Sequence, residues 1–337
     1  MTLDAAIVTD ISAIQSLAVG WTELASRDAA TPFQAFEWHL AWWELVGRYE
    51  NVRPYIVSFF AGPRLCGIAP LAIREEDGQR VLEFSSSPWA DYHDVLVDRS
   101  DGAADLVHRG LVEMIEHGLQ ERRWSSVALR DLSPNSAFAA FVEGEAGSLL
   151  SVVPGVVCPR ADLAAVDNSG SLGPQSEYAI KQRRLERLGR LECLLHTTPQ
   201  EIRRCIPDFM AMHLRQWRPR ADCGLTFDRP EMVRFYTGCV PIIGATGGLV
   251  LAELRLDARP IGYYFGFLYR RTFWGYRTTF DTGLRKYSPG GVMHRLLFRR
   301  LRANGYDTFD FMRVGNAYKR RYATEIPLNR DIVYGWR

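Results

Sequence analysis

Hydrophobic and polar residues alternate along the first half of the chain in a pattern that predicts both strands and helices. Residues 5–9 alternate like a short strand, and further strands are predicted at residues 54–61, 64–73, 80–85, 94–97 and 125–130. Apolar residues recur at helical spacing in residues 11–26, 36–46, 102–121 and 134–143. The first half is therefore predicted to combine a mostly antiparallel sheet with flanking helices.

The second half repeats this order after Asp167 to Gln175, a segment typical of a linker. Helices are predicted at residues 176–190, 199–217, 230–239 and 289–303. Strands are predicted at residues 191–196, 249–256, 260–268, 272–280, 307–314 and 331–336.

Two short stretches, one in each half, are similar in sequence and position. Arg64-Leu65-Cys66-Gly67 and Arg259-Pro260-Ile261-Gly262 each begin a strand after a turn. A chain of 337 residues also exceeds an ordinary single domain. We predict an α/β (α+β) protein with two copies of one unit, over residues 1–165 and 176–337; two unrelated domains are the alternative.

The two halves differ strongly in charge although the whole chain carries only +2. Residues 1–160 contain 12 arginines, no lysine and 22 acidic residues, a net charge of −10. Residues 161–337 carry a net charge of +12. This asymmetry predicts that the second half binds an anion.

Composition excludes several classes of protein. With 47% hydrophobic and 24% charged residues, the chain is neither disordered nor fibrous. Asp4 and Asp10 are not typical of a signal peptide, and no uncharged run is long and regular enough to span a membrane, so we expect a cytoplasmic protein. The six cysteines are scattered without a C-x-x-C pair, which predicts no metal site and no disulfide framework.

The strongest local signal is a loop and helix start after the predicted strand 272–280. Ser288 and Pro289 are helix start signals, and Gly290 and Gly291 allow a ligand close to the unpaired N–H groups of the first turn. The loop before them contributes Arg285 and Lys286. These residues predict a pyrophosphate cradle; a capped helix beside a solvated basic loop explains them equally well.

A second signal follows the strand 307–314. Asp310 sits among apolar neighbours, where a carboxylate needs a partner or its pKa rises. Its alternative role is a structural ion pair with an arginine. Tyr318 is a candidate proton donor to a leaving group, and Lys319 a candidate ligand of phosphate or carboxylate; a surface Tyr-Lys pair is the alternative.

Three further groups are candidate substrate contacts, each with a plainer explanation. Tyr92, His93 and Asp94 lie in a polar-aromatic loop that would attract an amine, or is simply a surface loop. Trp38 belongs to an aromatic cluster that is either a ligand platform or core. The basic helix carries Arg183, Arg184 and Arg187. This helix would bind the phosphates of CoA or of a nucleotide-linked substrate, would bind an RNA backbone, or is a solvated face.

Several of these stretches resemble a known family. They are Thr31-Pro32-Phe33-Gln34-Ala35-Phe36-Glu37-Trp38 with Trp42-Trp43, the helix Lys181 to Gly189, Tyr287-Ser288-Pro289-Gly290, and Phe309-Asp310-Phe311 with Gly315 and Tyr318-Lys319. In order and spacing they resemble the CelD-like acetyltransferases, found with bacterial cellulose and exopolysaccharide genes, within the GNAT superfamily. That family is related to the Fem-type aminoacyl transferases, which carry two GNAT-like units.

The resemblance implies a tandem-GNAT fold with an acyl-CoA between the fourth and fifth strands of a unit. Strand 272–280 would be the fourth and strand 307–314 the fifth, with the pyrophosphate on the loop from Arg285 to Gly291. In Fem-type relatives the same cleft receives the acylated end of a transfer RNA. Ser288 and Pro289 interrupt the usual Q/R-x-x-G-x-G/A signature, so acyl-CoA and aminoacyl-tRNA both stay open as donors.

Direct acyl transfer to an amine would follow from this resemblance. It needs a base, donors for the oxyanion and an acid. Asp310 or Asp281 is the expected base, backbone amides of strand 272–280 the oxyanion donors, and Tyr318 the acid. We expect an N-acyltransferase that uses acyl-CoA and a small-molecule amine, including sugar- or peptide-like amines. The alternatives are a transferase that uses aminoacyl-tRNA and a binding protein without activity.

Overall fold

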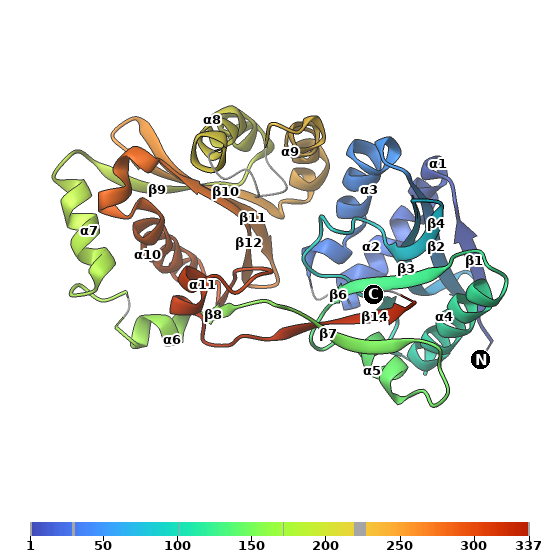
Figure 1. The fold of residues 1–337 in the computed structure, drawn as a ribbon. Coiled ribbons are helices and arrows are strands. Elements are labelled where there is room, and N and C mark those ends of the chain that lie inside the picture. Colours follow the sequence, from blue (N-terminus) through green and yellow to red (C-terminus); the bar gives the residue numbers. More distant parts are fainter. Residues whose placement is uncertain (1, 29–30, 101, 171, 219–226, 336–337) are drawn as a thin grey trace. The chain divides into compact units, whose positions relative to one another are not determined.

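The chain folds into two compact units in the computed structural model, which describes residues 2–28, 31–100, 102–170, 172–218 and 227–335 (Figure 1). The first unit comprises Met1–Val157 and Leu328–Arg337, and the second comprises Cys158–Pro327. The charge contrast follows this division, because the first unit carries −10 and the second +12.

The first unit contains an eight-stranded sheet in the order β1-β2-β3-β4-β6-β14-β7, with β5 paired to β3. Its strands are β1 (Asp4–Val8), β2 (Val52–Ala61), β3 (Arg64–Glu76), β4 (Gln79–Phe84), β5 (Leu96–Val97), β6 (Ser126–Leu132), β7 (Ser151–Val157) and β14 (Leu328–Tyr334). Its helices are α1 (Ile11–Ile14), α2 (Ala18–Asp28), α3 (Phe36–Leu45), α4 (Ala103–Gln120) and α5 (Ala137–Gly144).

The second unit contains a six-stranded sheet in the order β8-β13-β12-β11-β10-β9. Its strands are β8 (Arg160–Asp162), β9 (Leu191–His196), β10 (Leu249–Leu256), β11 (Arg259–Tyr269), β12 (Thr272–Phe280) and β13 (Thr308–Asp310). Its helices are α6 (Leu163–Asn168), α7 (Glu177–Glu186), α8 (Pro199–Trp217), α9 (Pro230–Ile243), α10 (Pro289–Ala303) and α11 (Ala317–Tyr322).

Both sheets are built in the same order, which confirms the predicted α/β class. Each begins with a strand and helices, continues with three antiparallel strands, and then passes through a helix to a parallel strand. The two similar stretches fall at equivalent places, because Arg64 begins β3 and Arg259 begins β11.

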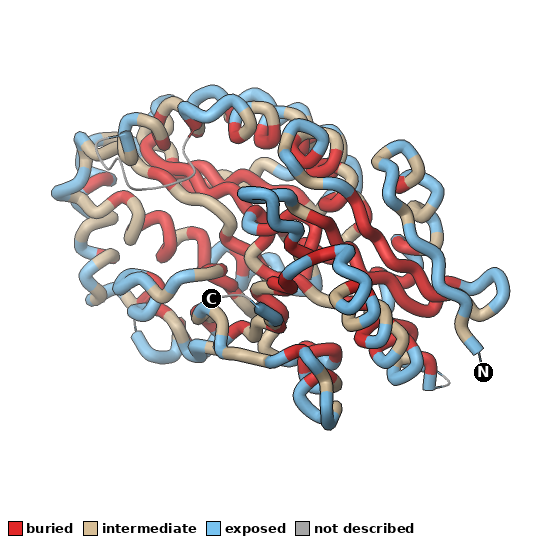
Figure 2. The backbone as a smooth tube through the Cα atoms, turned by 45° about the vertical axis from the view of Figure 1, so that its right-hand side comes forward, coloured by how far each residue is buried: buried red, intermediate tan, exposed pale blue. Residues whose placement is uncertain are grey.

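The cores form where strands are covered on both faces. In β3, nine consecutive residues from Leu65 to Ile73 are buried, which happens only when side chains on both sides of the pleat meet protein. The central strands and the inner sides of the helices are the buried parts of the chain (Figure 2). Each buried leucine or phenylalanine stabilises such a core by about 1.5–3 kcal/mol.

The unit boundaries differ from the prediction in one important respect. The last strand, β14, pairs with β6 and β7 and so completes the first sheet, whereas the sequence analysis gave it to the second unit. The first unit also ends at Val157 rather than residue 165, because β8 pairs with β13 of the second sheet. Such pairings join segments far apart in sequence, and hydrophobic periodicity does not report them.

Several elements are shorter or additional. The predicted strand 307–314 ends at Asp310, because Met312 and Val314 adopt positive φ angles of 62° and 75° that turn the chain away. The predicted linker begins inside α6, and α6, α11, β7 and β8 were not predicted. Residues 171 and 336, which fall in the predicted linker and last strand, lie outside the described residues. Within the described ranges, no helix has the length and hydropathy needed to cross a membrane.

Candidate active site

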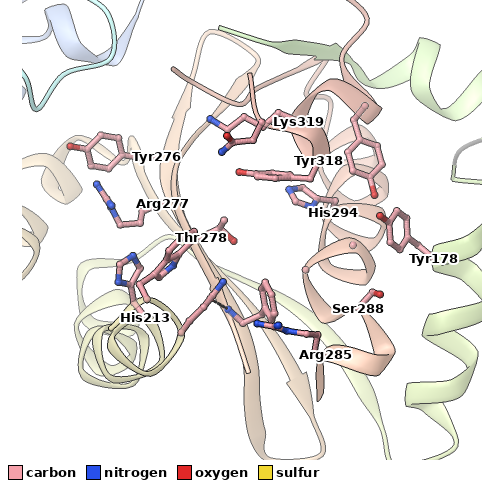
Figure 3. Close-up of a pocket in the computed structure, with 17 residues that line it drawn as sticks. Tyr178, His213, Tyr276, Arg277, Thr278, Arg285, Ser288, His294, Tyr318 and Lys319 are labelled. Carbon is pink, nitrogen blue, oxygen red and sulfur yellow. Dashed lines mark hydrogen bonds between the residues drawn. The ribbon is translucent and has the colours of Figure 1, made fainter. Parts of the chain in front are cut away.

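A pocket forms in the second unit where two strands separate. β12 and β13 pair only between Thr272–Trp274 and Thr308–Asp310. Beyond this point β13 ends while β12 continues to Phe280, so the sheet opens. A pocket of about 590 Å³ lies there, lined by residues of β12, α8, α10, α11 and α7 (Figure 3).

A β-bulge in β12 brings backbone to this pocket. Arg277 pairs with Phe265 and Gly275 pairs with Gly266, so the register shifts by one residue at Tyr276. Such a bulge bends the strand locally and changes where its residues point. Tyr276 lines the pocket, so the bulge lies on the wall where the amides of strand 272–280 were expected to stabilise an oxyanion.

The predicted cradle lies on the pocket wall. Arg285, Ser288, Gly290 and Gly291 line it, whereas Lys286 does not. The Lys286 ammonium instead lies 5.0 Å from the centre of the Tyr287 ring, and its carbonyl accepts a hydrogen bond from Lys181. Among the described residues, no side chain caps the start of α10. The first-turn N–H groups and the positive end of the helix dipole are thus available to an anion.

The two glycines also have a packing role that the sequence did not indicate. A Cβ on Gly291 would lie 2.0 Å from the ring of Tyr178, and a Cβ on Gly290 would lie 3.3 Å from the ring of Phe280. The aromatic rings of α7 and β12 therefore approach the helix backbone closely, which any side chain at Gly291 would prevent.

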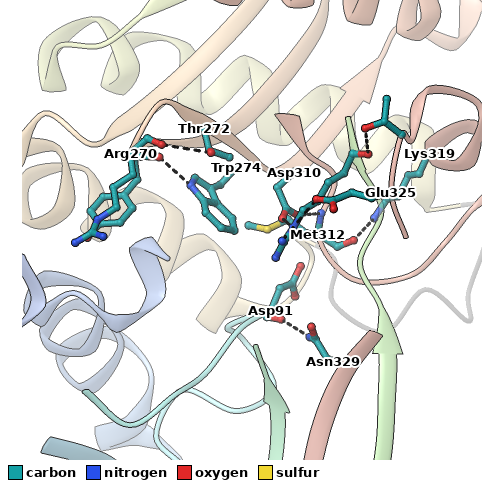
Figure 4. Close-up of polar contacts among 12 residues, drawn as sticks. Asp91, Arg270, Thr272, Trp274, Asp310, Met312, Lys319, Glu325 and Asn329 are labelled. Carbon is teal, nitrogen blue, oxygen red and sulfur yellow. Dashed lines mark hydrogen bonds and ion pairs between the residues drawn. The ribbon is translucent and has the colours of Figure 1, made fainter. Parts of the chain in front are cut away.

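Tyr318 and Lys319 reach the pocket from α11, as predicted from their position after the fifth strand. Burial raises the pKa of Tyr318 to about 12, and Tyr264 donates a hydrogen bond to its hydroxyl. Tyr318 therefore keeps its own proton available for a ligand. The Lys319 ammonium donates to the carbonyls of Met312 (3.4 Å) and Arg313 (2.5 Å), which holds it in place (Figure 4).

The two carboxylates predicted as bases are not among the described residues that line the pocket. Asp310 is fully buried and accepts hydrogen bonds from the Arg160 guanidinium (2.7 Å) and the Met312 N–H (2.7 Å) (Figure 4). It thus has the alternative role, a structural ion pair, and it fixes the turn that ends β13. Asp281 pairs with Arg259 and caps the 3-10 turn after β12 through the Gly283 N–H.

Two buried histidines line the pocket and were missed from the sequence. His213 lies on α8 and His294 on α10, and both are at least 95% buried. Burial lowers the pKa of His213 to about 3 and that of His294 to about 4, so both are neutral at physiological pH. The one available signal was that His294 lies one helical turn after Gly290, on the same face as the cradle.

The predicted substrate residues of the first unit are structural. Tyr92 and His93 are buried, and the His93 ring stacks on Phe84 at 5.0 Å between ring centres. Asp94 accepts hydrogen bonds from the Val95 N–H and the Ser136 hydroxyl, and burial raises the pKa of Asp94 to about 7. Trp38 is 1% exposed and donates to Ser86, so it belongs to the core.

The predicted basic residues of α7 and the loop after it point to solvent. Arg183, Arg184 and Arg187 are exposed and do not line the pocket. Arg183 donates to the Pro174 carbonyl at 2.8 Å. Only Tyr178 of this helix contributes to the pocket lining.

A second polar cluster lies outside the pocket lining. The side chains of His196, Cys205 and Glu253 come within 4.8 Å of one another, a grouping whose atoms suit a metal ion. Arg255, however, donates to both Glu253 oxygens (2.8 and 3.0 Å). Hydrogen bonds to Cys205 and Glu253 raise the pKa of His196 to about 9, so an imidazolium also faces the carboxylate. Two protein cations therefore already compensate the charge of the Glu253 carboxylate.

Known proteins can now be compared with this geometry. Residues 176–320 match the family model of the acetyltransferase (GNAT) domain. This part of the chain therefore has the GNAT acyltransferase fold. The matched residues contain the diverging strands, the uncapped helix and the pocket described above. A search of curated protein sequences gave no significant match.

Solved structures share the fold of the whole chain at low identity. The structure is similar to that of FemX, with a TM-score of 0.63 and 10% identity over 98% of this chain and 96% of that one. It is also similar to the C-terminal domain of a putative lysylphosphatidylglycerol synthetase from Agrobacterium fabrum, with a TM-score of 0.59 and 11% identity over 96% and 93% of the two chains. L-PGS from Bacillus licheniformis gives 0.58 and 11% over 94% and 91%. These similarities concern the fold.

Proposed function

We propose that this protein is an N-acyltransferase that moves an acyl group from acyl-CoA to an amine by direct attack. The observation that carries the proposal is the uncapped start of α10 beside Arg285, on the wall of a pocket between diverging strands, within the GNAT-matched residues. A diphosphate suits this place because helix N–H groups, the helix dipole and a guanidinium all favour negative charge.

The pocket residues then have assignable roles. The acyl carbonyl would lie against the β12 bulge at Tyr276, and backbone N–H groups of strand 272–280 would hold the developing oxyanion. Tyr318 would give its proton to the departing thiolate, and the Lys319 cation would stabilise negative charge nearby. The aromatic side chains of Trp217, Tyr276 and Phe280 would cover the apolar arm of the donor.

The proposal also concerns the narrower family within the GNAT superfamily and the role of the first unit. The resemblance of residues 31–319 to CelD-like acetyltransferases supports acetyl-CoA as the donor and a cytoplasmic location. The first unit would be a degenerate copy that does not bind a donor, because the loop holding Tyr92 and His93 is buried in it.

Donor binding gives the direct test, because the loop contains a matched pair of cations. We expect acetyl-CoA to bind the wild-type protein in isothermal titration calorimetry. Arg285→Ala, which removes a cation from the pocket wall, should weaken binding about tenfold, the value of one charge-assisted hydrogen bond. Lys286→Ala is the control and should change the Kd less than twofold. Absence of acetyl-CoA binding to the wild type would refute the proposal.

An aminoacyl-tRNA donor is the second candidate. The fold similarity to FemX and to lysylphosphatidylglycerol synthetase domains favours it, as does the exposed basic group Arg183, Arg184 and Arg187. If it is correct, charged transfer RNA binds with an affinity that falls steeply with salt. Replacing the three arginines by glutamine would then flatten that salt dependence, whereas it would leave acetyl-CoA binding unchanged.

A further inference from the structure

Two buried histidines on the pocket wall each have a ring nitrogen without a hydrogen-bond partner among the described residues, His213 Nδ1 and His294 Nε2. His294 is 95% buried, and no described residue hydrogen-bonds its Nε2. The backbone of Gly290, one turn earlier on α10, favours the protonated ring. We assign this interaction to Nδ1, because Nε2 has no hydrogen-bond partner among the described residues. The imidazole proton is therefore held on Nδ1, and Nε2 presents a lone pair.

The surroundings keep this imidazole neutral and shield it from solvent. Its ring centre lies 5.7 Å from that of Tyr318, 5.6 Å from that of Tyr264 and 5.4 Å from that of Tyr322. Burial, together with the nearby Lys319 charge, lowers its pKa to about 4. Leaving a buried acceptor unpaired destabilises the folded state. An apolar side chain would avoid that cost, so a ligand is the natural partner for Nε2.

We infer that Nε2 of His294 accepts the proton of the attacking amine during acyl transfer, an inference that rests on the proposed function. Figure 3 shows the His294 ring beside Tyr318 on the α10 wall of the pocket. The two groups are thus the base and the acid of one reaction, supplied by neighbouring elements.

The step balances without any further reactant. The amine nitrogen bonds to the acyl carbon while its proton passes to His294 Nε2. The C–S bond of the thioester breaks, and the departing thiolate takes the proton of Tyr318. The proton then passes from the imidazolium to the Tyr318 phenolate, which restores both groups. The products are an amide and free CoA.

His213 is a weaker candidate for this role. It lies on α8, and a nearby cation, Arg277, adds to burial in opposing its protonation, as Lys319 does at His294. Among the described contacts, it has no ring contact with Tyr318, whereas His294 does. It serves instead as a second histidine to test.

Kinetics with acetyl-CoA and a panel of amino sugars, amino acids and polyamines test the inference. We expect His294→Gln to lower kcat roughly 100-fold, the usual contribution of a general base. Its remaining rate should rise with hydroxide concentration, a dependence that a packing defect would not create. His39→Gln is the matched control: His39 is 99% buried and neutral, because burial lowers its pKa to about 3, and it lies in the first unit.

Three results separate the inference from the proposed function. Near-normal turnover by His294→Gln, or a full loss in His213→Gln alone, would overturn the inference but leave the acyltransferase proposal intact. Failure of acetyl-CoA to bind the wild type would overturn both. If no amine in the panel is acylated, the imidazole nitrogen shifts in NMR decide: we predict a proton on Nδ1 and none on Nε2 at pH 7, and a protonated Nε2 contradicts the inference.

Discussion

The two units share a strand order but differ at the place where the sheet opens, next to β4 in the first unit and next to β12 in the second. We call this place the gap: it is filled in the first unit and open in the second. In the first unit β4 runs parallel to β6, and the loop after β4 returns to fill the space: His93 bridges to Leu132 and its N–H donates to Asp131. In the second unit β13 ends early and a pocket of about 590 Å³ remains beside β12.

The connection between the fourth strand and the following helix explains this difference. In the first unit this connection comprises residues 85–102 and is long enough to fill the gap; we call it the plug. In the second unit it comprises only residues 281–288. A repeated fold therefore yields one closed copy and one open copy through the length and content of a single loop.

The residues that end the two fourth strands provide the largest contrast. Phe84 is fully buried against the plug, whereas Phe280 is only partly buried and lines the pocket. We expect Phe84→Ala to lower the free energy of unfolding by about 3–5 kcal/mol. Phe280→Ala should cost about 1 kcal/mol but weaken acetyl-CoA binding. Denaturant unfolding and calorimetry measure both; equal losses of stability would mean that the two gaps are equally filled.

Tyr318 sharpens the comparison at the level of chemistry. Tyr318→Phe keeps the ring but removes the proton donor, so kcat should fall about 10- to 100-fold with an unchanged Kd for acetyl-CoA. Tyr322→Phe, on the same helix and pocket wall, is the control and should retain most of the wild-type turnover. If both variants behave like the wild type in a steady-state assay, Tyr318 is not the acid.

The smallest expected effect is a pH-dependent change in Tm on replacing Asp94, which lies in the plug. Its pKa is raised to about 7 by burial, so the folded state holds a proton that the unfolded state loses near pH 3.8. The stability that this proton contributes is complete below pH 3.8 and is lost as pH rises through about 7. Asp94→Asn, which keeps the hydrogen bonds, should therefore raise Tm at pH 8 more than at pH 5. A pH-independent change in thermal melting would contradict the buried-carboxylate explanation.

Local patterns predicted much of the second unit. The predicted ranges of β9, α8, β10, β12 and α10 match the structure, because each carries its own periodicity and start signals. The sequence also predicted site residues that line the pocket: four cradle residues, Tyr318 and Lys319. These positions follow from one loop, one helix start and the turn after one strand.

The remaining parts depend on contacts that no local pattern contains. Whether Asp310 faced a ligand or the core was decided by Arg160, 150 residues earlier in the chain. The placement of β14 in the first sheet likewise depends on pairing with β6 and β7. His294 resembled an ordinary core residue until the structure showed that its Nε2 has no hydrogen-bond partner among the residues it describes.

Hydrogen exchange with and without acetyl-CoA tests the central claim, that the open gap of the second unit holds the acyl donor. The account predicts protection of residues 276–280 and 288–294, at the bulge and the first turns of α10, and no change in residues 84–94 of the first unit. Protection of residues 84–94 without protection of the α10 start would contradict it.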